Sequence, residues 1–169
     1  MKLEEAIRTA LACEYKIRDL YRGYADRLED EKGKRVFGHL AEDEQRHVDY
    51  LEHKLKEWQD SGKITVEDLD TVIPPKEKIQ QAMRAIGKTL SREDRGVEQQ
   101  MLSKALKVEL ETSAMYEELV EKMEGDVKKM FARFLEIEEG HVAAVQYELD
   151  YVAHTGFWCD FLESEWESY

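Results

Sequence analysis

Cysteine, proline and glycine are all scarce in this chain of 169 residues. The two cysteines, Cys13 and Cys159, lie near opposite ends of the sequence and form neither a disulfide framework nor a closely spaced metal-binding pair. This usage is typical of a reducing compartment, and we expect the cytoplasm. The two prolines are adjacent, at Pro74 and Pro75, so long helices are possible on both sides of them.

An excess of positive charge and long apolar runs are lacking as well. Asp and Glu number 38 against 25 Lys and Arg, a formal net charge of -13 that would repel the phosphates of nucleic acids. No apolar run approaches the roughly 18 residues that a membrane helix needs, and the charged N-terminus lacks the apolar centre of a signal peptide. We therefore expect neither nucleic acid nor membrane as a partner. With 42% hydrophobic residues the chain can still build a core.

Apolar residues recur at alternating steps of three and four, which is the period of amphipathic helices. This pattern predicts an all-α fold with four long helices, at about 2–29, 33–60, 93–124 and 126–154. Short turns join the first two and the last two helices, whereas the crossover 61–92 is long and contains a short helix after the prolines. The expected architecture is a ferritin-like four-helix bundle over 1–154. The remaining residues, 155–169, form an acidic, aromatic C-terminal tail.

The two halves of the chain repeat each other. A shift of 95 residues superimposes the first helix on the third, and a shift of 94 superimposes the second on the fourth. The matched residues include Ala10, Leu11, Glu14, Tyr21, Glu42, Glu44, His47 and Val48, with Ala105, Leu106, Glu109, Tyr116, Glu136, Glu138, His141 and Val142. The repeat predicts two helix hairpins related by an approximate twofold axis.

Four glutamates occupy positions in the apolar stripes where leucine would be expected, namely Glu14, Glu44, Glu109 and Glu138. A buried charge without a partner costs several kcal/mol at least, so these positions need compensation. His47 and His141 follow two of the glutamates by three residues, on the same helical face. Two Glu-x-x-His pairs with one further glutamate from each remaining helix are the ligand inventory of di-iron and di-manganese bundles.

Charge matching favours the same interpretation. Four carboxylates carry four negative charges, and two divalent metal ions neutralise them. Oxygen-rich ligation with one imidazole per metal suits two iron ions, with manganese as the other candidate, better than copper or a thiolate zinc site. Tyr21 and Tyr116 each lie two turns beyond a glutamate, where the phenol could hydrogen-bond a ligand carboxylate. The alternative is a core tyrosine whose hydroxyl reaches any acceptor.

The segments CEYKIRDLY, EDEQRH, VELETSAMY and EIEEGH resemble the helix motifs of the rubrerythrin-like branch of the ferritin superfamily. The resemblance implies that Glu14, Glu44, His47, Glu109, Glu138 and His141 are metal ligands, with Glu44 and Glu138 as bridges. Typical rubrerythrins add a rubredoxin-like domain with four cysteines, and two cysteines cannot build it, so we expect that domain and its electron relay to be missing. They also carry an extra glutamate where this chain has Thr112. Glu111 is nearby, but we expect it to face elsewhere.

The resemblance implies a non-haem di-iron oxidoreductase, of peroxidase or ferroxidase type, that reduces hydrogen peroxide or dioxygen in oxidative-stress defence. An external electron donor would restore the ferrous state. Two alternatives stay open, namely an iron-binding, storage or sequestration protein without efficient turnover, and a metal-free bundle used for interaction. The long crossover would also permit a homodimer in which helix pairs are exchanged between two chains.

Overall fold

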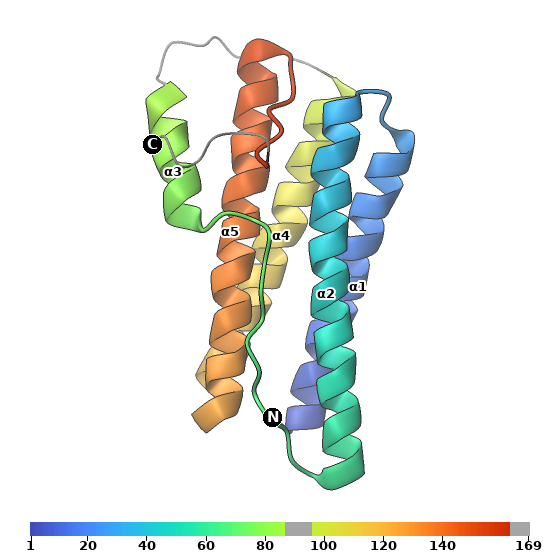
Figure 1. Ribbon diagram of the computed structural model, residues 1–169, viewed down its shortest axis with the longest axis vertical. Coiled ribbons are helices and arrows are strands. Elements are labelled where there is room, and N and C mark those ends of the chain that lie inside the picture. Colours follow the sequence, from blue (N-terminus) through green and yellow to red (C-terminus); the bar gives the residue numbers. More distant parts are fainter. Residues whose placement is uncertain (87–95, 163–169) are drawn as a thin grey trace.

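The computed structural model describes residues 1–86 and 96–162, and in these ranges the chain is helical with no strand, which confirms the predicted all-α fold (Figure 1). The helices are α1 (Leu3–Arg27), α2 (Glu31–Ser61), α3 (Lys76–Ile86), α4 (Val97–Lys122) and α5 (Gly125–Thr155). The predicted third helix begins at 93, but residues 93–95 lie outside the described ranges, and α4 is described from Val97.

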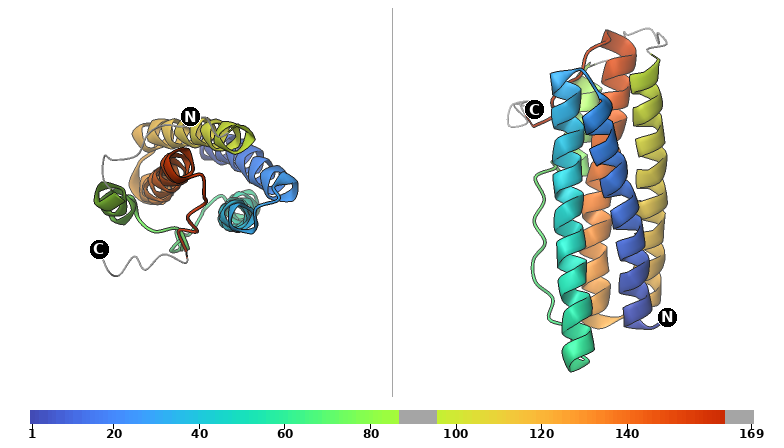
Figure 2. Two further views of the ribbon diagram at one scale, coloured as in Figure 1. Left: turned by 90° about the horizontal axis from the view of Figure 1, so that it is seen from above. Right: turned by 90° about the vertical axis from the view of Figure 1, so that its right-hand side faces the viewer.

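The four long helices form an elongated bundle of two hairpins (Figures 1 and 2). Helix α1 packs along α2, α4 packs along α5, and α1 also contacts α4. After α2 the chain runs back in an extended crossover along the bundle and enters α3, which packs on the outside of α5. The two hairpins predicted from the repeat are therefore joined by a segment that spans much of the bundle length.

Local sequence signals determine where α2 begins and ends. The Asp30 carboxylate accepts hydrogen bonds from the backbone N–H groups of Lys32 and Gly33, which otherwise lack partners in the first helical turn. At the other end Gly62 adopts φ 68°, a left-handed conformation that glycine tolerates best, and its N–H closes the last turn on Trp58. The helix therefore begins two residues before the predicted position, directly after its cap.

The apolar core is divided into two clusters along the bundle axis. One cluster, towards the α1–α2 turn, is built around Tyr24, Phe37 and Leu102. The other, towards the N-terminus, is built around Phe131 and Phe134. The positions between the clusters in the sequence of each long helix are taken by buried acidic and histidine side chains rather than by leucine or valine. Two apolar layers thus enclose a polar layer in the middle of the bundle.

The start of the C-terminal tail packs on the bundle. Trp158 and Phe161 are buried in the first cluster, and the indole N–H of Trp158 donates a hydrogen bond to Glu98 at 2.9 Å. The Trp158 ring contacts Phe37 edge-on at 5.5 Å between centroids. Neighbouring Phe157 is 72% exposed. The last part of the predicted tail, 163–169, lies outside the described residues.

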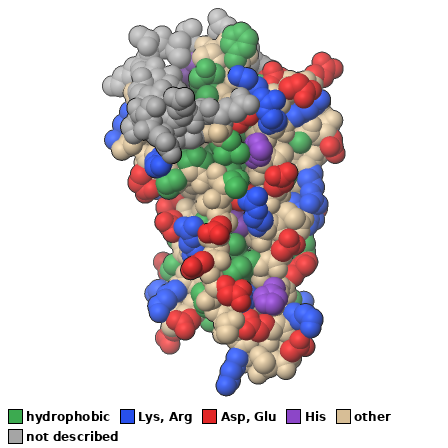
Figure 3. Space-filling view, in the orientation of Figure 1, with side chains coloured by type: hydrophobic (Ala, Val, Ile, Leu, Met, Phe, Trp, Pro, Cys, Tyr) green, Lys and Arg blue, Asp and Glu red, His purple; other side chains and the backbone are tan. Residues whose placement is uncertain are grey.

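Acidic and basic side chains are interspersed over the face seen in Figure 3, with apolar side chains showing between them. Within residues 1–86 and 96–162, no helix combines the length and the apolar character that crossing a membrane requires. Among the described residues only a few acidic side chains are buried, so most of the acidic groups there form an ordinary solvated surface.

Candidate metal centre

The six side chains predicted as metal ligands come together in the polar layer. Helix α1 contributes Glu14 and α4 contributes Glu109, whereas α2 and α5 each contribute a glutamate and the histidine three residues later. All six, Glu14, Glu44, His47, Glu109, Glu138 and His141, are completely buried. Each comes from the apolar stripe of its helix, so burying that stripe in the bundle necessarily carries the acids and imidazoles inside.

The six side chains form two overlapping groups that could each hold a metal ion. One group consists of Glu14, Glu44, His47 and Glu138, and the other of Glu44, Glu109, Glu138 and His141. In each group one ligand atom from every residue lies within 4.8 Å of the others. Glu44 and Glu138 belong to both groups, which is the position that bridging carboxylates would occupy.

Both imidazole rings turn the same nitrogen towards the carboxylates. Nδ1 of His47 lies 2.9 Å from Glu44, 3.1 Å from Glu138 and 3.2 Å from Glu14. Nδ1 of His141 lies 2.7 Å from the other oxygen of Glu44. The two rings are stacked, with centroids 5.4 Å apart and planes only 5° from parallel. This arrangement reproduces the approximate twofold symmetry of the sequence repeat.

Burial is the largest influence on the ionisation of the Glu109 carboxyl, and it raises the pKa of Glu109 well above its usual range. The charge of His141 opposes this shift, and that of Glu44 adds to it. Burial by itself lowers the pKa of an imidazole, but the charges of Glu14 and Glu44 raise the pKa of His47 well above its usual value. His141 shifts in the same direction. The site therefore concentrates negative charge and attracts protons or cations.

The two predicted tyrosines contact carboxylates of the site across the bundle. The hydroxyl of Tyr21 on α1 donates a hydrogen bond to Glu109 on α4, and the hydroxyl of Tyr116 on α4 donates one to Glu14 on α1. Both tyrosines are completely buried. Each phenol therefore orients the glutamate of the opposite half through one carboxylate oxygen, and in Glu14 the other oxygen lies 3.2 Å from Nδ1 of His47.

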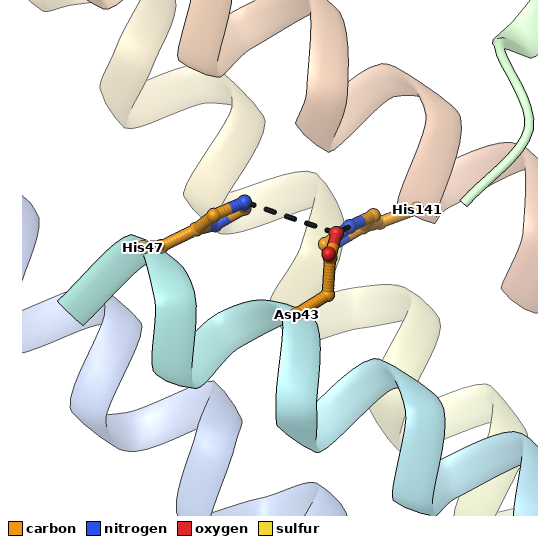
Figure 4. A group of neighbouring side chains, drawn as sticks. All are labelled: Asp43, His47 and His141. Carbon is orange, nitrogen blue, oxygen red and sulfur yellow. Dashed lines mark hydrogen bonds and ion pairs between the residues drawn. The ribbon is translucent and has the colours of Figure 1, made fainter. Parts of the chain in front are cut away.

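Asp43, which is not among the residues predicted from the sequence, is a completely buried carboxylate on α2 (Figure 4). One of its oxygens, Oδ2, lies 2.8 Å from Nε2 of His141, the ring nitrogen that faces away from Glu44. Burial disfavours ionisation of Asp43, but the hydrogen bond with His141 and the nearby imidazole charges lower the pKa of its carboxyl well below the usual range. A signal for this residue exists in the repeat, because a shift of 94 aligns Asp43 with the apolar Ile137 and so indicates an inward position.

The crossover also contributes to the site. The Thr71 hydroxyl donates a hydrogen bond to Asp43 at 2.6 Å, and the Arg133 guanidinium donates one to the Leu69 carbonyl at 3.0 Å. Gly140 precedes His141 on α5, and a Cβ atom there would lie 3.1 Å from the carbonyl oxygen of Pro74. Glycine at this position thus permits the crossover to pass close to α5 beside the candidate ligands.

Other acidic and polar residues near the motifs lie outside the cluster. Glu111 is exposed and pairs with Lys16 at 3.3 Å across α1 and α4. Glu42 and Glu136, which also repeat, are exposed as their register predicts. Thr112 is buried, but its hydroxyl donates to the Val108 carbonyl at 3.0 Å within its own helix. The position of the extra rubrerythrin glutamate therefore supplies no carboxylate here.

The buried residues fit a pair of divalent metal ions. Among the described residues, both carboxylate oxygens of Glu138 and Oε2 of Glu44 and of Glu109 make no hydrogen bond. In this part of the chain, Oε2 of Glu44 and Oε1 of Glu138 have only the ion-pair contact with the shared Nδ1 of His47. Burying such oxygens without compensation is costly, and a cation bound between them removes the cost. Mostly oxygen ligands with one imidazole per group suit iron or manganese. Fold and site together place the protein in the class of helical bundles with a carboxylate-rich candidate metal centre.

Comparison with known protein families shows which family within this class the chain belongs to. The family model described as Rubrerythrin matches residues 5–95, more than half of the chain, and the chain belongs to this family of di-iron carboxylate proteins. The matched residues include Glu14, Glu44 and His47, whereas Glu109 and the rest of the second hairpin lie beyond them. No curated protein and no solved structure gives a significant match.

Proposed function

We propose that the chain binds two iron ions and reduces hydrogen peroxide or dioxygen in defence against oxidative stress. The observation that carries the proposal is the buried cluster of four carboxylates and two imidazoles, in which two overlapping groups of ligand atoms share Glu44 and Glu138. Four carboxylates balance the charge of two divalent ions, so the filled site is neutral. Manganese is the other ion that this ligand set suits.

The residues of the chain have separable tasks in this proposal. Glu44 and Glu138 would bridge both metals, Glu14 and His47 would complete one position, and Glu109 and His141 would complete the other. When bound there, two ferrous ions would supply the two electrons that cleavage of a peroxide O–O bond requires. The apolar clusters on both sides of the polar layer, around Phe37 and Phe134, limit the access of water to the candidate ligands.

Restoring the ferrous state requires an external electron donor. Thr112 stands at the position of the extra glutamate, and this departure favours a second candidate function. In that alternative the chain binds and sequesters iron without efficient turnover.

Elemental analysis of protein purified without oxygen, followed by stoichiometric addition of hydrogen peroxide, tests the proposal. We expect about two irons per chain, an absorbance change that depends on peroxide, and consumption of one peroxide per metal pair. Sustained consumption with a chemical reductant would support the oxidoreductase. Iron uptake well beyond two per chain would support storage, and failure to bind any metal would contradict both functions.

A further inference from the structure

The two histidines of the candidate metal centre differ on the side that faces away from the carboxylates. Nε2 of His141 lies 2.8 Å from Oδ2 of Asp43 and donates a hydrogen bond to it. Nε2 of His47 lies 3.9 Å from the same oxygen and has no hydrogen-bond partner in the part of the chain that the structure describes. Figure 4 shows Asp43 beside His141, with the longer separation to His47 as a dashed line.

The difference originates in the sequence. The two halves of the chain match at their Glu-x-x-His motifs, but the residue before the glutamate is Asp43 in the first half and Ile137 in the second. Ile137 is 3% exposed and belongs to an apolar cluster, so its side chain offers no acceptor to an imidazole. The approximate twofold symmetry that relates the six candidate ligands therefore does not extend to the preceding residues, Asp43 and Ile137.

The carboxylate of Asp43 is held from several directions. The hydroxyl of Thr71 donates to Oδ2 at 2.6 Å, while Nη1 of Arg46 lies 2.8 Å from Oδ1. The backbone N–H of Val72 donates to Oδ1 at 3.4 Å. These contacts come from α2 itself and from the crossover, so the orientation of Asp43 does not depend on His141 alone.

A carboxylate behind an imidazole improves that imidazole as a metal ligand. It keeps the proton on Nε2, so that the lone pair of Nδ1 points at the metal, and it orients the ring and raises the basicity of the ligand. We infer that Asp43 makes the two metal positions unequal, so that the position completed by His141 fills first and loses its metal last. This inference rests on the metal pair of the proposed function.

Partial loading of the whole chain with Co²⁺ tests the order of filling directly. Cobalt is stable in air and scatters X-rays anomalously, so its location is visible in a crystal grown with one equivalent per chain. We expect the anomalous density to lie mainly at the His141 position, and a titration to show a tighter and a weaker binding step separated by about tenfold or more. Equal density at both positions, or a single binding step, would overturn the inference.

Asp43→Asn keeps the size of the side chain but removes the acceptor charge. We expect this variant to weaken the tighter step by about 10- to 100-fold, to leave the weaker step within about threefold, and to retain a capacity of two ions per chain. Glu42→Gln is the matched control, because it removes one acidic charge from the adjacent, exposed position. The control should leave both steps unchanged.

Different outcomes of these experiments would contradict the inference and the proposed function. The inference would be contradicted if Asp43→Asn weakened both binding steps equally, or if Glu42→Gln weakened the tighter step as much as Asp43→Asn does. Either result would show that the loss of any nearby negative charge weakens metal binding. Absence of metal binding by the unmodified chain would contradict the proposed function itself. If Asp43→Asn does not fold, as circular dichroism would show, the anomalous density of the unmodified protein still decides the order of filling.

Discussion

The hydroxyl of Tyr21 donates a hydrogen bond to the carboxylate of Glu109, which joins α1 to α4 across the centre of the bundle. The counterpart of this pair in the repeat is Tyr116 with Glu14, so the two halves exchange the same contact. A tyrosine seven residues beyond its own glutamate is about 10 Å further along the helix axis and cannot reach it. The phenols therefore support the glutamates of the opposite hairpin and couple the two halves at the site.

Tyr21→Phe should weaken metal binding without preventing it. The substitution removes the donor that orients Glu109, so we expect the affinity for Co²⁺ to fall by about 10- to 100-fold with two ions still bound per chain. Tyr15→Phe is the control, since the Tyr15 hydroxyl also donates to a glutamate, Glu52, but outside the site. An equal effect of both substitutions, measured in parallel titrations, would show that Tyr21 has no special role in metal binding.

Glu138→Gln should reduce the amount of metal bound. Glu138 belongs to both groups of candidate ligands, so the loss of its charge affects both positions at once. We expect clearly fewer than two ions per chain by elemental analysis, and loss of most of the metal-dependent rise in thermal midpoint. Glu136→Gln changes an exposed acid two residues away and should bind metal normally. Full loading of Glu138→Gln would exclude Glu138 as a bridge.

Stability and metal affinity should respond to pH in opposite directions. The pKa values of His47 and His141 are raised above the ordinary 6.5, because nearby carboxylates outweigh the effect of burial. Protonation of these groups stabilises the metal-free fold fully below pH 6.5, and this contribution is lost as the pH rises through the raised values. Metal binding displaces the same protons, so it tightens as the pH rises.

Two measurements check this pH dependence between about pH 6 and about pH 9. The thermal midpoint of the metal-free protein should fall over this range, while the Co²⁺ dissociation constant decreases. The stabilisation by metal, taken as the difference between the two thermal midpoints, should therefore grow with pH. A metal-free midpoint that rises with pH would contradict the assignment of protons to the site.

Trp158→Ala should destabilise the fold, because the indole is 3% exposed and packs on Phe37. We expect the free energy of unfolding to decrease by about 3–5 kcal/mol, as for other large aromatic side chains removed from a core. The adjacent Phe157 is 72% exposed, and Phe157→Ala should change stability by less than about 0.5 kcal/mol. Chemical denaturation of both variants measures the contrast, and a loss for Trp158→Ala as small as that expected for Phe157→Ala would show that packing of Trp158 adds no stability.

The bundle and the positions of six candidate ligands could be predicted from the sequence because helical periodicity is local. In a helix with an apolar stripe, a residue such as Glu14 that takes a stripe position must face the core wherever the neighbouring helices lie. The internal repeat strengthened this reasoning, since Glu44 and Glu138 recur in the same register. The exposure of Glu111 follows from the same geometry, because it lies about 200° around the helix from Glu109.

Contacts between distant segments could not be read in this way. Periodicity placed Tyr21 on the face of Glu14, yet only the packing of α1 against α4 pairs its hydroxyl with Glu109. Asp43 lies beside the stripe of α2, and its partners, His141 and Thr71, come from α5 and from the crossover, so helical periodicity does not predict these contacts. The crossover has no helical period, so nothing in its sequence reveals that it passes beside the site.

The sequence by itself determined which side chains enter the polar layer, because the helical period and the burial of apolar surface act within each helix. The tertiary structure decided which of these side chains face one another, and which of the two imidazoles the single buried Asp43 contacts. His47 and His141 are equivalent in the repeat, but only His141 meets Asp43 at 2.8 Å. Hydrogen bonds act over about 3 Å, and the relative placement of separate helices determines which groups come that close.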